Sequence, residues 1–134
     1  MKDFWINLPV KNADKSKDFF ARLGFTFNPH YNAPNSASML LGDKGVVVML
    51  FDEPTFKGFT GGAIASASNE VLLSIDAQSK EEVDEMARKA VEAGGTSDHK
   101  PYEMQGWMYG CVFTDIDGHK WNVLHMDMGK MPKG

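Results

Sequence analysis

Residues 4–10 read FWINLPV, and residues 70–76 read EVLLSID. Both stretches are apolar and rich in β-formers, and each predicts a β-strand. An amphipathic helix follows each one and stops at a glycine, the first running from about Ala13 to Arg22 before Gly24 and the second ending before Gly94. Three short strand-like runs follow each helix. The sequence therefore predicts two βαβββ units in tandem. Paired repeats of this kind bury a shared core.

The fold class that follows is α+β, with two tandem βαβββ units in one domain of 134 residues. Unit one spans residues 1–51, unit two spans residues 70–126, and residues 127–134 form a tail. The long stretch 52–69 is expected to be a linker, or alternatively a lid whose Phe56 and Phe59 close over a ligand. The remaining predicted strands are Phe25–His30, Ala37–Leu41, Val46–Phe51, Thr96–Tyr102, Met108–Thr114 and Lys120–Met126.

Local signals support both helices. Asn12 is the expected N-cap of the first, and Ser79 to Glu82 form a capping box at the start of the second. The predicted buried stripes are Ser16, Phe19, Phe20 and Leu23 in the first helix, and Val83, Met86, Ala87, Ala90 and Val91 in the second. Supporting ion pairs are expected between Asp84 and Arg88 and between Glu85 and Lys89.

The overall composition limits the classes of molecule that we expect this protein to bind. The net charge is −4, and no basic stripe interleaved with aromatic residues is present, so nucleic-acid binding is not expected. The single cysteine, Cys111, excludes an internal disulfide framework and fits a reducing compartment. The sequence also contains no long apolar run. We therefore expect a cytoplasmic protein without a membrane partner.

Side-chain alternation along the strands predicts two different sheet faces. One face is continuously apolar and is expected to lie under the helices. The other mixes apolar walls with isolated polar groups, as ligand sites do. The predicted ligand-binding residues on this face are Trp5, Asn7, Met49, Phe51, Leu72, Asn122 and Leu124. Trp5 and Phe51 offer flat surfaces for stacking a ligand ring, or alternatively pack at a dimer seam.

The repeat suggests which of these positions are equivalent. Met49 and Asn122 each lie four residues past a turn glycine, Gly45 or Gly118. Trp5 and Glu70 each lie five residues before the last aliphatic residue of their strand. We therefore expect Trp5, Met49, Glu70 and Asn122 to converge where the two sheets face one another.

Glu70 is the candidate catalytic residue. A carboxylate beside apolar walls could act as a general base, with an asparagine amide orienting a substrate oxygen. The alternative is a solvated residue at the strand edge, or one that is hydrogen-bonded to Asn122. The histidines have no ligand-like spacing, and a surface position is expected for His119 and a hydrogen-bonded core or dimer-facing position for His125. Cys111 is expected to be a small buried residue.

Three segments carry a family resemblance: Leu8–Asn12, Phe19–Phe25 and Phe113–Val123, the last containing Asp115-Ile116-Asp117-Gly118-His119 followed by Trp121. The chain resembles the vicinal oxygen chelate superfamily of glyoxalase I, bleomycin-resistance proteins and extradiol dioxygenases, and within it a group of stand-alone glyoxalase-like proteins. The resemblance implies paired βαβββ units whose curved sheets form a half-barrel cleft. It also implies homodimers, commonly with shared or exchanged units.

In metal-using members of that superfamily, four cleft positions hold the metal. They fall here on Trp5, Met49, Glu70 and Asn122. Only Glu70 is a good ligand for a hard metal, whereas zinc, nickel or iron sites use three or more N, O or S donors. We therefore expect no cofactor and a cleft that binds, and in one form sequesters, a small, partly aromatic molecule. The alternatives are a metal-dependent lyase, isomerase or dioxygenase, and a metal-free enzyme with Glu70 as the base.

Overall fold

The computed structural model describes residues 1–65, 70–97 and 99–132. The chain divides into two compact units, Met1–Ser66 and Ala67–Gly134, and each has its own sheet. The mixed α+β architecture and the tandem βαβββ order are confirmed. Three parts of the expectation fall outside the described residues: positions 66–69 of the linker, position 98 of one strand, and the last two residues of the tail. Within the described ranges, no helix combines the length and apolar character that crossing a bilayer requires.

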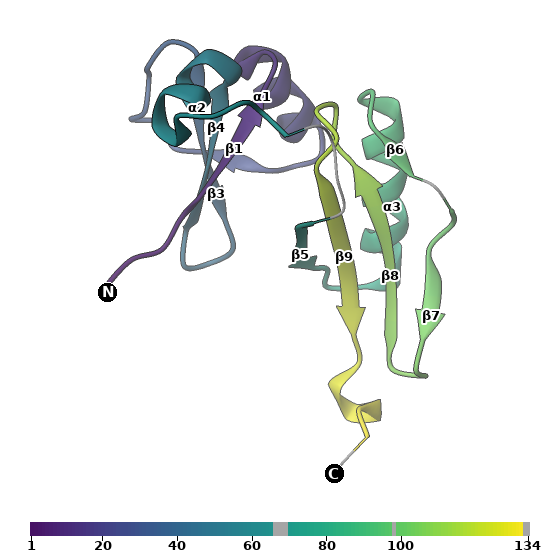
Figure 1. Ribbon diagram of the computed structural model, residues 1–134. Coiled ribbons are helices and arrows are strands. Elements are labelled where there is room, and N and C mark those ends of the chain that lie inside the picture. The colour runs from purple at the N-terminus through teal and green to yellow at the C-terminus, as the bar shows by residue number, and fades with distance from the viewer. Residues whose placement is uncertain (66–69, 98, 133–134) are drawn as a thin grey trace. The chain divides into compact units, whose positions relative to one another are not determined.

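Unit one is a four-stranded sheet in the order β1-β4-β3-β2, in which β1 is parallel to β4 and the other pairs are antiparallel. Its elements are β1 (Ile6–Val10), α1 (Ala13–Arg22), β2 (Thr26–Phe27), β3 (Ser36–Leu41), β4 (Val46–Asp52) and α2 (Glu53–Thr60). Figure 1 shows this unit in purple to teal, with α1 packed against the sheet.

Helix α1 forms where the sequence predicts it. The Asn12 side chain accepts a hydrogen bond of 3.0 Å from the Lys15 amide, and Gly24 adopts the left-handed φ of 93° that ends the helix. The predicted apolar stripe is buried, and Phe19 and Phe20 meet edge to face with ring centroids 5.1 Å apart. These rings cover the buried residues of β3 and β4, so the first core lies between α1 and one face of its sheet.

Unit two repeats this plan with one extra strand. Its sheet has the order β5-β9-β8-β6, with β7 also paired to β8. The elements are β5 (Leu72–Asp76), α3 (Lys80–Glu92), β6 (Thr96–Ser97), β7 (Tyr102–Met104), β8 (Met108–Thr114), β9 (Lys120–Met126) and the 3-10 turn η1 (Met128–Lys130). Helix α3 packs on β8 and β9 (Figure 1). Phe113 and Trp121, which are paired in register on these strands, stack with nearly parallel rings.

The start of α3 differs in detail from the expected capping box. The Ser79 hydroxyl accepts a 3.1 Å hydrogen bond from the Glu82 amide, as predicted. The Glu82 carboxylate, however, accepts from the amide of Gln78, one residue earlier than a standard box, at 2.8 Å. Val83, Ala87 and Ala90 form the buried face. Val91 is exposed because it lies about 80° around the helix from Val83, which corrects the predicted stripe.

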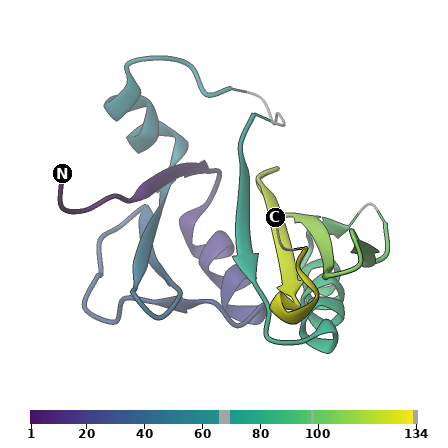
Figure 2. The ribbon, with the colours of Figure 1, turned by 90° about the horizontal axis from the view of Figure 1, so that it is seen from below.

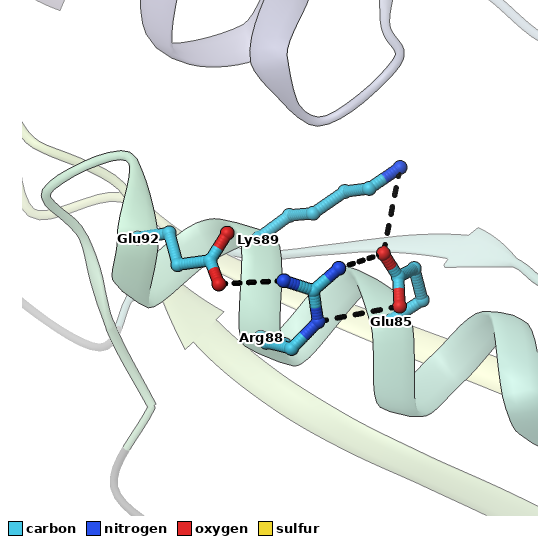
Figure 3. Close-up of polar contacts among 4 residues, drawn as sticks. All are labelled: Glu85, Arg88, Lys89 and Glu92. Carbon is cyan, nitrogen blue, oxygen red and sulfur yellow. Dashed lines mark hydrogen bonds and ion pairs between the residues drawn. The ribbon is translucent and has the colours of Figure 1, made fainter.

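The exposed side of α3 carries an ion-pair ladder (Figure 3). Arg88 pairs with Glu85 one turn earlier and with Glu92 one turn later, and Lys89 lies 3.9 Å from Glu85. The expected Glu85–Lys89 pair is therefore confirmed. Arg88 takes different partners from the one expected, because Asp84 accepts a hydrogen bond of 2.6 Å from the Tyr109 hydroxyl. The hydrogen bond from Arg88 lowers the pKa of Glu85 below its ordinary value.

Two predicted strands prove shorter or broken. The strand expected over Phe25–His30 is only β2, because the Asn28 side chain accepts from the His30 amide in a turn and Pro29 has no amide donor. The strand expected over Thr96–Tyr102 separates into β6 and β7, which pair with opposite ends of β8. Pro101, just before β7, cannot donate to a ladder.

The stretch expected to be a linker contains a helix. Residues Glu53–Thr60 form α2, capped by the Asp52 side chain, with Pro54 in its first turn and Gly61 in the left-handed conformation at its end. Figure 2 shows α1 and α2 on opposite sides of the β1–β4 pair. Helix α2 packs on β1 and β4, and the Phe59 ring meets the Phe51 ring edge to face at 5.0 Å.

Candidate functional site

The predicted ligand-binding residues lie on the sheet faces opposite α1 and α3. In unit one, β4 has the α1-facing residues Val48 and Leu50 fully buried, and the alternate residues Met49 and Phe51 point to the other face. In unit two, Trp121 and Val123 face α3, so the alternate residues of β9 belong to the opposite face. We call these the open faces of units one and two.

The open face of unit one places an amide, a thioether and a hydroxyl in one row. Met49 is paired in register with Asn7 on β1 and with Ser38 on β3. Asn7 is exposed, whereas Met49 and Ser38 are buried. Phe51 lies one row further along and is covered on one side by Phe59. The open face of unit one thus has an exposed amide beside a buried thioether, with a half-buried aromatic ring one row away.

The open face of unit two has a similar row. Asn122 is paired in register with Ser74 and with Val112, and its amide nitrogen donates to the Ser74 hydroxyl at 3.1 Å. This hydrogen bond leaves the Asn122 carbonyl available as an acceptor. Leu72 and Leu124 lie in the neighbouring rows on either side, and Leu72 is 52% exposed. An amide between two aliphatic side chains is the mixed surface that the alternation predicts.

Trp5 and Glu70 lie outside the strands in which they were expected. The β1 ladder begins at Ile6, and Trp5 is 55% exposed. The β5 ladder begins at Leu72, paired with Lys120, so Glu70 would face Gly118, which still belongs to the turn before β9. Glu70 is exposed.

The registers also correct the predicted equivalence of these positions. The first-strand partner of Met49 is Asn7, and that of Asn122 is Ser74. Counting back along each strand, Trp5 corresponds to Leu72 rather than to Glu70. The convergence of residues from both units, and the roles of the individual side chains, stay predictions.

The donor set does not suit a hard divalent metal. The rows centred on Met49 and Asn122 supply amides, hydroxyls and a thioether, but no imidazole or carboxylate. Among the residues that the structure describes, no three His, Cys, Asp or Glu side chains gather as a metal site requires.

The contacts of Cys111 and His125 indicate structural roles. Cys111 is buried against α3, with its sulfur 4.0 Å from the Val83 carbonyl, and burial raises the pKa of the thiol to about 11. It is therefore protonated at neutral pH and a poor nucleophile. Nδ1 of His125 lies 3.2 Å from the Ala77 carbonyl oxygen, which confirms a hydrogen-bonded position.

Asp115 organises the β8–β9 turn, a role that the sequence pattern alone did not reveal. The Asp115 residue is only 4% exposed, and one carboxylate oxygen accepts from the amides of Asp117 and His119 at 2.9 and 3.0 Å. The other accepts from the Trp121 indole at 3.1 Å and lies 3.0 Å from His119 Nδ1. His119 is therefore a partly buried partner of Asp115, which corrects its expected surface position. The signal was present as an Asp with His and Trp four and six residues later.

The Asp115–His119 pair predicts a pH-dependent stability. Burial alone would lower the pKa of His119, but the hydrogen bond and charge of Asp115, aided by Asp117, outweigh it and raise the pKa above its ordinary value. The contribution is complete below the unfolded pKa of about 6.5 and is lost as pH rises through the folded pKa. Urea unfolding between pH 5.5 and 9 should show this decline in the wild type and in the exposed-histidine control His30→Gln. An unchanged decline in His119→Gln would contradict the assignment.

Two small pockets lie within single units, away from the open-face rows. One, of about 110 Å³, lies at the starts of α1 and α2 and is lined by Asn12, Asn35 and Asp52, among others. The other, of about 40 Å³, lies beside the start of α3 and includes Lys80, Trp107 and His125. Tyr109 lines it too and bonds to α3, so this ring faces the helix and not the open face.

Comparison with known proteins identifies the family. Residues 4–123 match the model of the Glyoxalase/Bleomycin resistance protein/Dioxygenase superfamily, which covers most of the chain. The chain belongs to this superfamily. The match runs from the start of β1 to the middle of β9 and includes the Asp115 turn, so most residues of the open faces lie within it. Comparison with curated proteins finds no match.

Solved structures agree with this assignment. A hypothetical protein from S. aureus is 32% identical, with a TM-score of 0.84 over 93% of this chain and 94% of the other. A glyoxalase/bleomycin resistance protein/dioxygenase family enzyme from Burkholderia phytofirmans PsJN is 17% identical, with a TM-score of 0.77 over 91% and 96%. The fosfomycin resistance protein FosX from Listeria monocytogenes is 18% identical, with a TM-score of 0.71 over 96% of each chain. The last two show the shared superfamily fold alone.

Proposed function

We propose that this glyoxalase-superfamily protein binds a small, partly aromatic molecule on its open sheet faces without a divalent metal. The observation that carries the proposal is the composition of the two rows. Each row sets an amide beside an apolar side chain, Asn7 beside Met49 in unit one and Asn122 beside Val112 in unit two. Apolar side chains orient an aromatic ring by contact, and a few fixed polar groups select ligands by hydrogen bonding to the substituents of the ring.

The chemistry of the side chains in the two rows favours binding over metal-assisted chemistry. An amide, a thioether and a hydroxyl are weak ligands for zinc, nickel or ferrous iron. Glu70, the one carboxylate among the predicted site residues, lies before β5 and outside the rows. Sequestration of the bound molecule is a function that needs no catalytic side chain and no metal. Homodimer assembly and a cytoplasmic location stay predictions.

A matched pair of variants tests this proposal in unit two. Leu72 on the open face and Val91 on α3 are equally exposed, at 52% and 53%, so serine at either position should leave the fold intact. With anilinonaphthalene sulfonate as an aromatic probe, Leu72→Ser should weaken binding about tenfold, because burying a leucine side chain contributes about 1.5–3 kcal/mol. Val91→Ser should leave the fluorescence titration unchanged.

Two further measurements test where the probe binds and whether its binding needs a metal. Amide chemical shifts should move at Asn122 and Leu124 as the probe is added, and EDTA should leave its affinity unaltered. Shifts confined to α3, or an equal loss of binding in both serine variants, would contradict binding at the open face. Binding that disappears with EDTA and returns with Zn²⁺ or Mn²⁺ would contradict the metal-free part of the proposal.

A further inference from the structure

Three methionines from three neighbouring strands stand in one row in unit two. Met104 on β7 is paired in register with Met108 on β8, and Met108 is paired in register with Met126 on β9. Directly opposite residues of antiparallel strands point to the same face, with their Cβ atoms about 4.5–5.5 Å apart. Three flexible thioether side chains therefore start from adjacent points on one surface. We call Met104, Met108 and Met126 the methionine row.

The contacts of Gly110 fix the face to which the row belongs. A Cβ atom added at Gly110 would lie 2.6 Å from a Leu124 methyl and 3.3 Å from the Met104 methyl. Met104 thus extends over β8 on the Leu124 side, which is the open face opposite α3. The row is also accessible, because Met104 and Met108 are partly exposed and Met126 is 39% exposed.

The chemistry of the row differs from that of the rest of the open face. Thioether sulfurs are neutral, polarisable donors that favour soft ions such as Cu(I), whereas hard ions favour oxygen. Leucine or valine would serve equally well if the positions only needed apolar bulk, as Leu124 and Val112 do in the next two rows of the same face. Of the nine methionines in the chain, three occupy this single row.

We propose that Met104, Met108 and Met126 form a three-thioether site for a soft monovalent metal ion, Cu(I) or its redox-inert analogue Ag(I). The site is separate from the Asn122 row and does not depend on the proposed binding of an aromatic molecule. The flexibility of methionine allows the three sulfurs to close on one ion without moving the strands. The negative net charge of the chain favours the approach of a cation.

Silver nitrate is the probe, in chloride-free buffer at pH 5.5. Most imidazoles carry a proton at this pH and bind metal weakly, whereas thioethers do not titrate. The thiol is removed by Cys111→Ala, with Cys111→Val as a second background if the first fails to fold. In protein labelled at the methionine methyl carbons, the signals of Met104, Met108 and Met126 should shift together and saturate at one equivalent of Ag(I).

Leucine replaces each methionine with little change in volume, so folding should be kept. Met104→Leu, Met108→Leu and Met126→Leu should each weaken Ag(I) binding by at least tenfold in calorimetry. Met39→Leu, in the buried core of unit one, should leave the affinity unchanged. Unshifted methyl signals at a tenfold excess of Ag(I), shifts centred on Met128 and Met131, or row variants that bind as tightly as the control would each overturn the proposal.

Discussion

Replacing Asp115 by alanine should destabilise the protein by about 3–5 kcal/mol, the loss typical of breaking a buried ionic pair. The variant removes the acceptor of four groups, including the Trp121 indole nitrogen and His119 Nδ1. Trp121 is fully buried, so its indole N–H has no water to replace the carboxylate. Urea unfolding followed by far-ultraviolet circular dichroism measures the change as a lower midpoint.

Unit one supplies the control for this variant. Asp43 lies in the turn before β4, the counterpart of the turn before β9, but it is exposed. Asp43→Ala should change the unfolding free energy by no more than about 0.5 kcal/mol, as is usual for surface positions. Equal losses in Asp43→Ala and Asp115→Ala would show that the buried network contributes nothing beyond the turn itself.

Gly110→Ala should destabilise the protein by about 3 kcal/mol, at the upper end of the usual cost of overpacking. The added methyl group would lie 2.6 Å from the Val123 carbonyl oxygen and 2.6 Å from the Leu124 side chain. The leucine can rotate away, but the carbonyl belongs to the β9 backbone and cannot move without separating β8 from β9. Thermal unfolding of the purified variant measures the loss.

A second glycine distinguishes crowding from a general effect of alanine. Gly58 lies inside α2, where an added Cβ would meet no atom within 4 Å. Gly58→Ala should stabilise the protein by about 0.5–1 kcal/mol, because alanine favours helix over glycine. The crowding argument fails if Gly110→Ala melts at the wild-type temperature.

Local signals in the sequence predicted the elements whose ends are fixed by their own side chains. Asn12 and Gly24 mark the ends of α1, and Ser79 marks the start of α3, because capping depends only on neighbours within a turn. Helix α2 was missed although Asp52, Pro54 and Gly61 are start and stop signals, since its small residues and Gly58 weaken the helical pattern between them. Strand ends were less predictable, because a strand ends where its partner does.

The candidate site shows the same limit. Alternation correctly placed Met49 and Phe51 on the face opposite α1, and Asn122 and Leu124 on the face opposite α3. Counting residues within one strand could not supply the register between strands, so Trp5 and Glu70 were treated as equivalents. The spacing of Asp115, His119 and Trp121 is the only trace of the Asp115 network in the sequence, because the four donors around its carboxylate come together only in three dimensions.

The pairing of the first strand with the last in each sheet has a consequence for biosynthesis. Strand β1 is hydrogen-bonded to β4, and β5 is hydrogen-bonded to β9, so neither sheet is complete until its final strand has been synthesised. The backbone hydrogen-bonding groups of β1 and of β5 therefore lack their strand partner while the ribosome adds the intervening residues. The partner of β1 ends at Asp52, so the N-terminal half can close its sheet before most of the C-terminal half has been translated.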